Sequence, residues 1–266
     1  MGEPRDAGLG AMMRLNNPVK DRLRAGGAAI GVFIPMPSPD VVEIVALAGF
    51  DFALLDAEHG RISPDDAYPM ILAAEARDVP AFVRVGENDR QVVLKYLDLG
   101  VSGVMIPQTN TPELAREAID AMRYAPSGLR GLAGGRTFDY GQGGPMSERV
   151  PAINDRVLSI IQFEHIDALP HLDTLLETPG LDVLFVGPTD LHQSMGFGGQ
   201  LGHPEVEAVI QQVVDTAKGQ GTTLAIVAPD AEQTNRRLKQ GFRMVVTNVP
   251  ALLMRASREM LAAIEH

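Results

Sequence analysis

Two carboxylate side chains each come at the end of a short apolar segment or just after it. Glu164 ends the segment IIQFE, and Asp190 follows the segment VLFVGPT. If both segments are strands of one parallel sheet, their carboxyl ends meet at one edge, where two carboxylates suit Mg²⁺ or Mn²⁺. Two other roles stay open, an ion pair between Glu164 and an arginine of a neighbouring strand, and a helix N-cap at Asp190. The two residues together favour a metal site.

A guanidinium and an imidazole end two further segments. Arg84 ends PAFVR, where it is suited to grip a substrate carboxylate through two parallel hydrogen bonds. The alternative is a structural ion pair with Asp56 or Glu58. His59 follows both acids in DAEHG and is either a proton carrier at neutral pH or a structural hydrogen-bonding residue. Beside a metal pocket, the role in proton transfer is favoured.

Several kinds of chemistry and partner are excluded by composition. The chain has no cysteine, so disulfides, thiolate metal sites and a cysteine nucleophile are absent. Its four lysines all fall in helical or tail segments, which argues against a Schiff base at a strand end. A formal charge of −11 argues against a nucleic-acid partner. No apolar run approaches the roughly 18 residues of a membrane span and no secretory signal opens the chain, so we expect a cytoplasmic protein without a membrane partner.

Eight short apolar segments alternate with segments of helical period along the chain. Eight strand-then-helix units in 266 residues fit a closed (β/α)8 barrel better than an open doubly wound sheet. We therefore expect one barrel domain over residues 1–266, with its active site at the carboxyl ends of the strands. The expected strands are residues 28–35, 51–58, 80–85, 103–108, 158–164, 182–188, 223–229 and 243–249.

Three segments stand apart from this alternation. Residues 1–20 are expected to form a loose N-terminal segment. Residues 125–157 are long for a connection and are expected to form a loop over the active site. Within it, Arg130 and Arg136 either contact a ligand or hold the loop or a subunit contact in place. The last helix is apolar on more than one side, so it packs either on another subunit or on its own barrel.

The motifs of these segments resemble a known family. The similarity covers nearly the whole chain and is carried by AGFDFALLDAEHG, PAFVRV, KYLDLGVSGVMIPQ, RYAPSGLRG, IIQFEH, VGPTDLHQSMG and HPEV. These motifs are similar to those of the HpcH/HpaI family of class II, metal-dependent pyruvate aldolases, which includes 4-hydroxy-2-oxoheptanedioate and 2-keto-3-deoxy sugar acid aldolases. The resemblance implies a (β/α)8 barrel whose last helix is often exchanged between the subunits of a dimer, with dimers assembled into hexamers.

The resemblance also implies an activity, the reversible cleavage of a 4-hydroxy-2-oxo acid to pyruvate and an aldehyde through a metal-stabilised pyruvate enolate. Glu164 and Asp190 would bind the divalent metal, with Mg²⁺ or Mn²⁺ expected and Co²⁺ or Zn²⁺ as further candidates. His59 would handle the proton of the aldol hydroxyl, with Asp98 as its partner from the same or a neighbouring subunit. The residues implied to bind the 2-oxo acid are Arg84, Gln162, Pro188, Thr189 and Asp190.

Departures from the family pattern keep other reactions open. Ala57 stands in DAEH where the family commonly has glycine, and TNVP replaces a Gly-Ser-Asp type of end after the eighth strand. Both changes bear on the aldehyde side of the pocket. Oxaloacetate decarboxylation, citrate-type condensation and the bond formation of macrophomate synthase use the same enolate and remain alternatives. A non-catalytic binding protein is disfavoured because the acidic pair, Arg84 and His59 are all intact.

Overall fold

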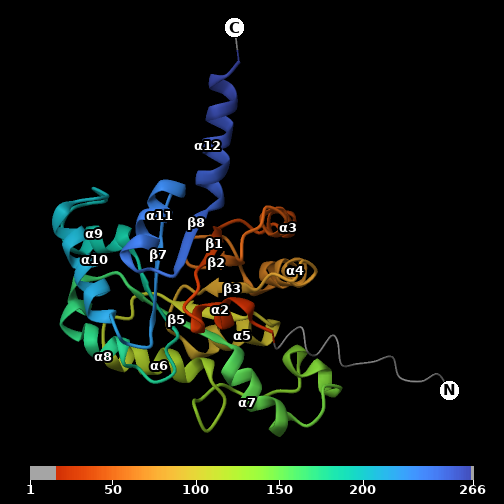
Figure 1. Cartoon of the computed structure of the whole chain (residues 1–266). Coiled ribbons are helices and arrows are strands. Elements are labelled where there is room, and N and C mark those ends of the chain that lie inside the picture. The colour runs from red at the N-terminus through yellow and green to blue at the C-terminus, as the bar shows by residue number, and fades with distance from the viewer. Residues whose placement is uncertain (1–15, 265–266) are drawn as a thin grey trace.

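The computed structural model describes residues 16–264, and their eight parallel strands close into a barrel in sequence order (Figure 1). This confirms the (β/α)8 fold expected from the alternation of segments. The strands are β1 (Ala29–Ile34), β2 (Phe52–Asp56), β3 (Ala81–Arg84), β4 (Gly103–Ile106), β5 (Leu158–Phe163), β6 (Val183–Val186), β7 (Thr223–Val227) and β8 (Met244–Asn248).

Aromatic and aliphatic side chains fill the inside of the barrel. Phe52 and Phe82 pack with their ring centroids 5.1 Å apart, and Phe33 meets Phe185 edge to face at 6.0 Å. Gly31 gives the Phe52 ring its space, since a Cβ there would lie 2.1 Å from the ring. The barrel interior is therefore a packed core, and polar groups meet only at its two ends.

Helices surround the strands, and many begin with a Ser, Thr, Asp or Asn cap followed by proline or an acid. Ser38 and Thr111 accept hydrogen bonds from Val41 N and Leu114 N, and Ser63 forms a capping box with Asp66. The α-helices are α2 (Pro18–Arg24), α3 (Pro39–Leu47), α4 (Pro64–Glu75), α5 (Arg90–Leu99), α6 (Pro112–Met122), α7 (Met146–Arg156), α8 (Leu172–Leu176), α9 (Pro188–Ser194), α10 (Pro204–Ala217), α11 (Ala231–Gln240) and α12 (Val249–Ala262). Two 3₁₀ helices are η1 (Arg136–Gly141) and η2 (Ile166–His171).

The long connection 125–157 lies at the amino-terminal end of the barrel, because it joins the end of α6 to the start of β5. Figure 1 shows α7 at the end of the barrel opposite α12. The connection carries η1 and α7, and Arg130 binds Asp98 at 2.9 Å while Arg136 binds Glu75 and the Leu99 carbonyl. The expectation of a loop over the active site of its own chain is therefore wrong. Both arginines fasten the connection to the C-terminal ends of helices.

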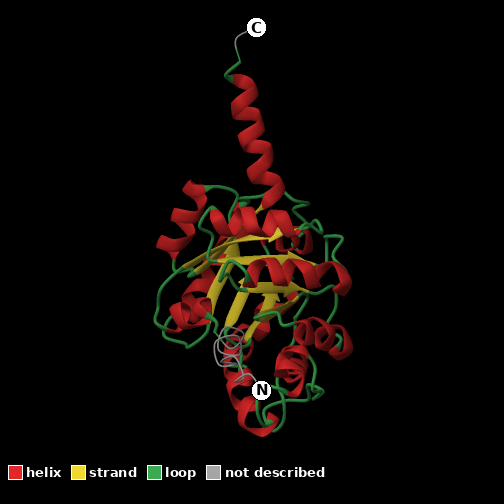
Figure 2. Ribbon diagram, turned by 90° about the vertical axis from the view of Figure 1, so that its right-hand side faces the viewer, coloured by secondary structure: helices red, strands yellow, loops and turns green. Residues whose placement is uncertain are grey.

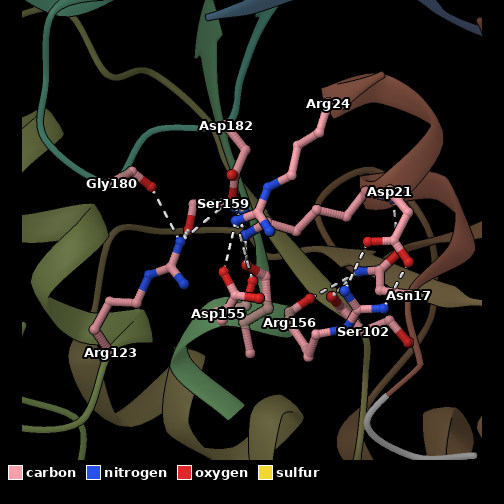
Figure 3. A network of polar contacts seen from close by, with 12 residues as sticks. Asn17, Asp21, Arg24, Ser102, Arg123, Asp155, Arg156, Ser159, Gly180 and Asp182 are labelled. Carbon is pink, nitrogen blue, oxygen red and sulfur yellow. Dashed lines mark hydrogen bonds and ion pairs between the residues drawn. The ribbon is translucent and has the colours of Figure 1, made fainter. Parts of the chain in front are cut away.

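The floor of the barrel is a polar network that begins at residue 17 (Figure 3). The side chain of Asn17 donates to the carbonyls of Ser102 and Arg156, and the buried ammonium of Lys20 donates to Asp182 and the Val157 carbonyl, both at 2.7 Å. Burial lowers the pKa of Lys20 to about 8, against the pull of Asp182.

Part of the expected loose segment 1–20 is thus ordered. Residues 1–15 lie outside the described part of the chain. Asn17 and Lys20, by contrast, are each 1% exposed. They close the amino-terminal end of the barrel, so the expectation is wrong for them.

Helix α12 projects away from the barrel, as Figures 1 and 2 both show. None of its described residues is buried. The helix therefore does not dock along its own barrel, one of the two arrangements expected for it. Large apolar side chains exposed at this end of the chain are Leu253, Met254, Met260, Leu261 and Ile264. Within residues 16–264, no helix is both long and apolar enough to cross a membrane.

The buried floor network makes a stability prediction. Replacing Asp182 by asparagine leaves the Lys20 ammonium and Arg123 without their shared counter-ion, so Asp182→Asn should lower the free energy of unfolding by about 3 kcal/mol. Asp155→Asn is the matched control, since Asp155 is half exposed and pairs with the exposed Arg24, and its cost should stay under about 1 kcal/mol. Urea unfolding of the two variants and the wild type measures both values, and equal losses would contradict the assignment.

Candidate active site

A pocket of about 370 Å³ opens at the carboxyl ends of the strands. It lies at the end of the barrel where residues following β2, β4, β5 and β6 converge. All of its lining side chains are polar, and none is a lysine. They are Glu58, His59, Gln108, Asn110, Glu164, His165, Asp190, Gln193 and Ser194.

Glu164 lies directly after β5 and is buried at the base of this pocket. The Gln108 backbone N–H donates to its Oε1 at 2.6 Å, and the Gln162 side chain donates to its Oε2. Gln108 has a φ of 51°, a costly conformation for a residue with a side chain, which aims this N–H at the carboxylate. In the described residues Glu164 is thus held by N–H donors, and the ion pair with an arginine, considered above, is not what the structure shows.

Burial raises the pKa of Glu164 from its ordinary value of 4.5 to about 7. The Gln108 hydrogen bond opposes this shift, whereas the negative charges of Glu58 and Asp190 add to it. The pocket therefore crowds carboxylates that repel one another, which a bound cation would relieve.

Asp190 lies in the first turn of α9, which follows β6. Strand β6 pairs with β5, the strand that precedes Glu164. The residue at the N-cap position is Gly187, and no side chain caps the helix, so the N-cap role considered for Asp190 is wrong. A Cβ on Gly187 would meet Glu164 at 2.9 Å, so glycine is needed for α9 to approach that carboxylate. Pro188 and Thr189 form the start of the same turn, and neither of them is among the pocket-lining residues.

Arg84 ends β3 opposite Asp56 of β2, and the two side chains form a buried two-pronged pair. Arg84 Nε and Nη2 donate to Asp56 Oδ1 and Oδ2 at 3.0 and 2.7 Å. Arg84 Nη1 lies 3.1 Å from Glu58 Oε2, and the guanidinium stacks 4.6 Å from the Phe33 ring centroid. The structural ion pair expected as one alternative for Arg84 therefore exists. It fixes the guanidinium against Glu58, which lines the pocket, whereas Arg84 itself is not among the lining residues.

His59 and Asp98, which are expected to work together, lie at opposite ends of the barrel within this chain. His59 lines the pocket with an exposed side chain, and its backbone N–H donates to Asp56 Oδ1 at 3.2 Å. Asp98 is in the last turn of α5, next to the floor, where it pairs with Arg130. A pair between them within one chain is therefore contradicted, and only a second copy can bring Asp98 to His59.

Some residues of the pocket were not identified from the sequence. Gln108 is different, since the sequence already marks it as a polar residue at the end of an expected strand, but no sequence pattern shows the backbone conformation that aims its N–H. Gln193 and Ser194 reach the pocket only because α9 turns across the barrel mouth, which no sequence pattern shows. Gln162, which was identified, is buried, and its Oε1 has no hydrogen-bond partner among the described residues.

The donor set of the pocket suits a hard divalent cation. Residues 16–264 contain no group of three or more His, Asp or Glu side chains placed to hold a metal. Two carboxylates of this pocket, Glu164 and Asp190, match the number of protein ligands usual for Mg²⁺, whose other positions are filled by water and substrate oxygens.

The closed barrel with an acidic pocket at the carboxyl ends of its strands defines a barrel enzyme. More narrowly, the chain belongs to the HpcH/HpaI aldolase/citrate lyase family, whose model matches residues 29–254. The family resemblance inferred from the motifs is thereby confirmed, and the chain is an aldolase, a carbon–carbon lyase.

Individual relatives agree with this assignment. The chain is 35% identical to a hydroxypyruvate/pyruvate aldolase of Sagittula stellata, covering 91% of this chain and 94% of the relative. It is 32% identical to a 2-keto-3-deoxy-L-rhamnonate aldolase of Klebsiella pneumoniae, covering 90% and 89% of the two chains. The crystal structure of an HpcH/HpaI aldolase from Desulfitobacterium hafniense matches with a TM-score of 0.86 at 29% identity, covering 92% of this chain and 95% of the other.

The raised pKa of Glu164 predicts a pH-dependent stability of the metal-free protein. With a pKa of about 7 in the folded state against 4.5 when unfolded, the folded state binds the proton more tightly, so stability is gained as the pH falls through this window and lost as it rises. Glu164→Gln, which imitates the protonated form, should flatten this dependence. Unfolding in EDTA at about pH 5 and about pH 7.5 tests it, with the exposed Glu87→Gln as control. Identical pH dependence in wild type and Glu164→Gln would refute it.

Proposed function

We propose that this aldolase reversibly cleaves a 4-hydroxy-2-oxo acid to pyruvate and an aldehyde, with a divalent metal at Glu164 and Asp190. The observation that carries the proposal is the buried Glu164 carboxylate in one pocket with Asp190, with the guanidinium of Arg84 held against the pocket residue Glu58. Pyruvate appears in the name of the relative from Sagittula stellata, and a 2-keto-3-deoxy acid in that of the relative from Klebsiella pneumoniae.

The donor half of the site binds the 2-oxo acid. Mg²⁺ or Mn²⁺, or else Co²⁺ or Zn²⁺, supplies positive charge that stabilises an enolate when bound. Arg84 contributes a second positive charge on the side of the pocket formed by β2 and β3. Gln162 would line the 2-oxo acid site, and the backbone N–H groups of Thr189 and Asp190 at the start of α9 would donate to its carboxylate. Pro188 has no N–H and would only contact the substrate through its backbone.

The acceptor half of the site handles the aldehyde. His59 is exposed at the pocket edge and is the residue that would take or return the proton of the aldol hydroxyl. Its proposed partner is Asp98 of a neighbouring subunit. The apolar, unburied α12 supports such an assembly, since an exchanged last helix would bury it in a dimer and permit hexamers built from dimers.

The donor chemistry predicts a metal-dependent release of pyruvate. With Mg²⁺ or Mn²⁺, pyruvate should form from 4-hydroxy-2-oxo acids, EDTA should abolish it, and added metal should restore it. Glu164→Ala should lower kcat/KM by about 100-fold or more. Borohydride with substrate should leave the enzyme active, because no lysine lines the pocket.

Oxaloacetate provides the discriminating arm of this experiment. Its decarboxylation requires the same pyruvate enolate but no aldehyde and no proton transfer at an aldol hydroxyl. Metal-dependent loss of oxaloacetate without cleavage of any hydroxy acid would replace the aldolase proposal with decarboxylation or condensation. Activity that persists in EDTA would refute both.

The shared site predicts complementation between inactive variants. His59→Ala and Asp98→Asn should each lose most aldolase activity. If His59 of one subunit works with Asp98 of another, a mixture of the two after subunit exchange should regain activity, because some sites then combine both intact residues.

Two measurements control this experiment. Leu253→Glu combined with Met260→Glu places charge on the apolar surface of α12 and should lower the mass in light scattering. The same double change should prevent the recovery of activity in the mixture. A monomeric wild-type protein, or no recovery from a mixture with proven exchange, would refute the shared site.

A further inference from the structure

The two acids that contact Arg84 hold it in different ways. Asp56 makes two hydrogen bonds of good geometry, at 3.0 and 2.7 Å, and is itself buried. Glu58 Oε2 lies 3.1 Å from Arg84 Nη1, yet among residues 16–264 this oxygen has no hydrogen-bond partner. One acid is therefore anchored on the guanidinium, and the other only lies against it.

Glu58 and Asp56 contact different nitrogens of the Arg84 guanidinium. Asp56 accepts from Nε and Nη2, a pairing set by the register of β2 and β3, and Glu58 lies against Nη1. Glu58 lines the pocket, whereas Asp56 does not. A substrate carboxylate that approaches Arg84 from the pocket therefore meets Nη1 and the Glu58 carboxylate together.

We propose that Glu58 stands in for the substrate carboxylate on Arg84 in the free enzyme and is displaced from Nη1 when a 2-oxo acid binds. This inference rests on the proposed function, because it takes the anion to be the carboxylate of the 2-oxo acid. Glu58 then acts as an internal competitor that weakens substrate binding, and Asp56 keeps the guanidinium in place during the exchange.

The surroundings of Glu58 favour the exchange. Burial raises the pKa of Glu58, and the charges of Asp56 and Asp190 add to that shift while Arg84 and His59 oppose it. The carboxylate is thus held in a costly place by one contact without a hydrogen bond. His59 Nε2 lies 3.9 Å from the same Oε2, so the displaced side chain has a polar neighbour within reach.

Asp56 also keeps the backbone fixed while the Glu58 side chain moves. Its Oδ1 accepts hydrogen bonds from the backbone N–H groups of Glu58 and His59, both at 3.2 Å. These bonds hold the turn after β2 independently of where the Glu58 carboxylate lies. Displacement therefore needs a side-chain rotation and no rearrangement of the barrel mouth.

The test uses oxalate, a planar dianion that resembles the pyruvate enolate, and measures its Kd by titration calorimetry with saturating Mn²⁺. Glu58→Gln should bind oxalate about fivefold more tightly than the wild type, since an amide competes poorly for a guanidinium. Glu58→Ala should also bind oxalate more tightly than the wild type, which controls for an effect peculiar to the glutamine side chain. Asp56→Asn should bind more weakly, because Arg84 loses its anchor.

Glu87→Gln is the matched control, since Glu87 is an exposed acid in the segment after β3 and lines no part of the pocket. Its Kd should stay within about twofold of the wild type, which separates competition at Arg84 from a general loss of negative charge. An unchanged or weaker Kd in both Glu58 variants, with normal wild-type binding, would overturn this inference alone. If the wild type binds no oxalate in the presence of metal, the inference and the proposed function fail together.

Discussion

The buried pair between Asp56 and Arg84 is the contact on which the active-site side of the barrel depends. The two residues face each other across β2 and β3, so the sheet register itself brings them together. Three N–H groups converge on Asp56 Oδ1, from Arg84 Nε and from the backbones of Glu58 and His59. One carboxylate thus orients the guanidinium and shapes the turn that carries both pocket residues. Removing either partner would leave a buried charge unpaired, which costs more than an ordinary surface contact.

The two ends of the barrel treat charge in opposite ways. At the floor, Lys20 and Arg123 share Asp182, so each buried cation has a carboxylate partner. At the mouth, burial raises the pKa of Glu58 and of Glu164, the charge of Asp190 adds to both shifts, and Arg84 opposes both. The floor thus pairs its buried charges, whereas the mouth keeps acids close together at the proposed ligand site, which lowers stability locally.

Sequence patterns were sufficient for the strands and for the residues at their carboxyl ends, because apolar periodicity and strand ends are local features. Connection 125–157 was misplaced because its length was given more weight than its topology, since any link from a helix to the next strand lies at the amino-terminal end. The burial of Lys20 depends on Asp182, 162 residues away in sequence. Likewise, the φ of 51° at Gln108 comes from the tertiary environment of Glu164. No local sequence pattern predicts the burial of Lys20 or the backbone conformation of Gln108.

The residues proposed for the two halves of the reaction come from different levels of structure, one from a single barrel and the other from the assembly of several copies. Everything proposed to hold the 2-oxo acid comes from strand ends of a single chain, where the barrel geometry fixes the distances. The proposed partner of His59, Asp98, lies at the opposite end of the barrel and is paired there with Arg130. The apolar surface of α12 is left uncovered. The proposal thus makes binding of the donor a property of the fold and makes the acceptor side depend on how copies of the chain pack. On this proposal, changes in α12 or in connection 125–157 would alter the acceptor side without moving the strand ends that are proposed to hold the 2-oxo acid.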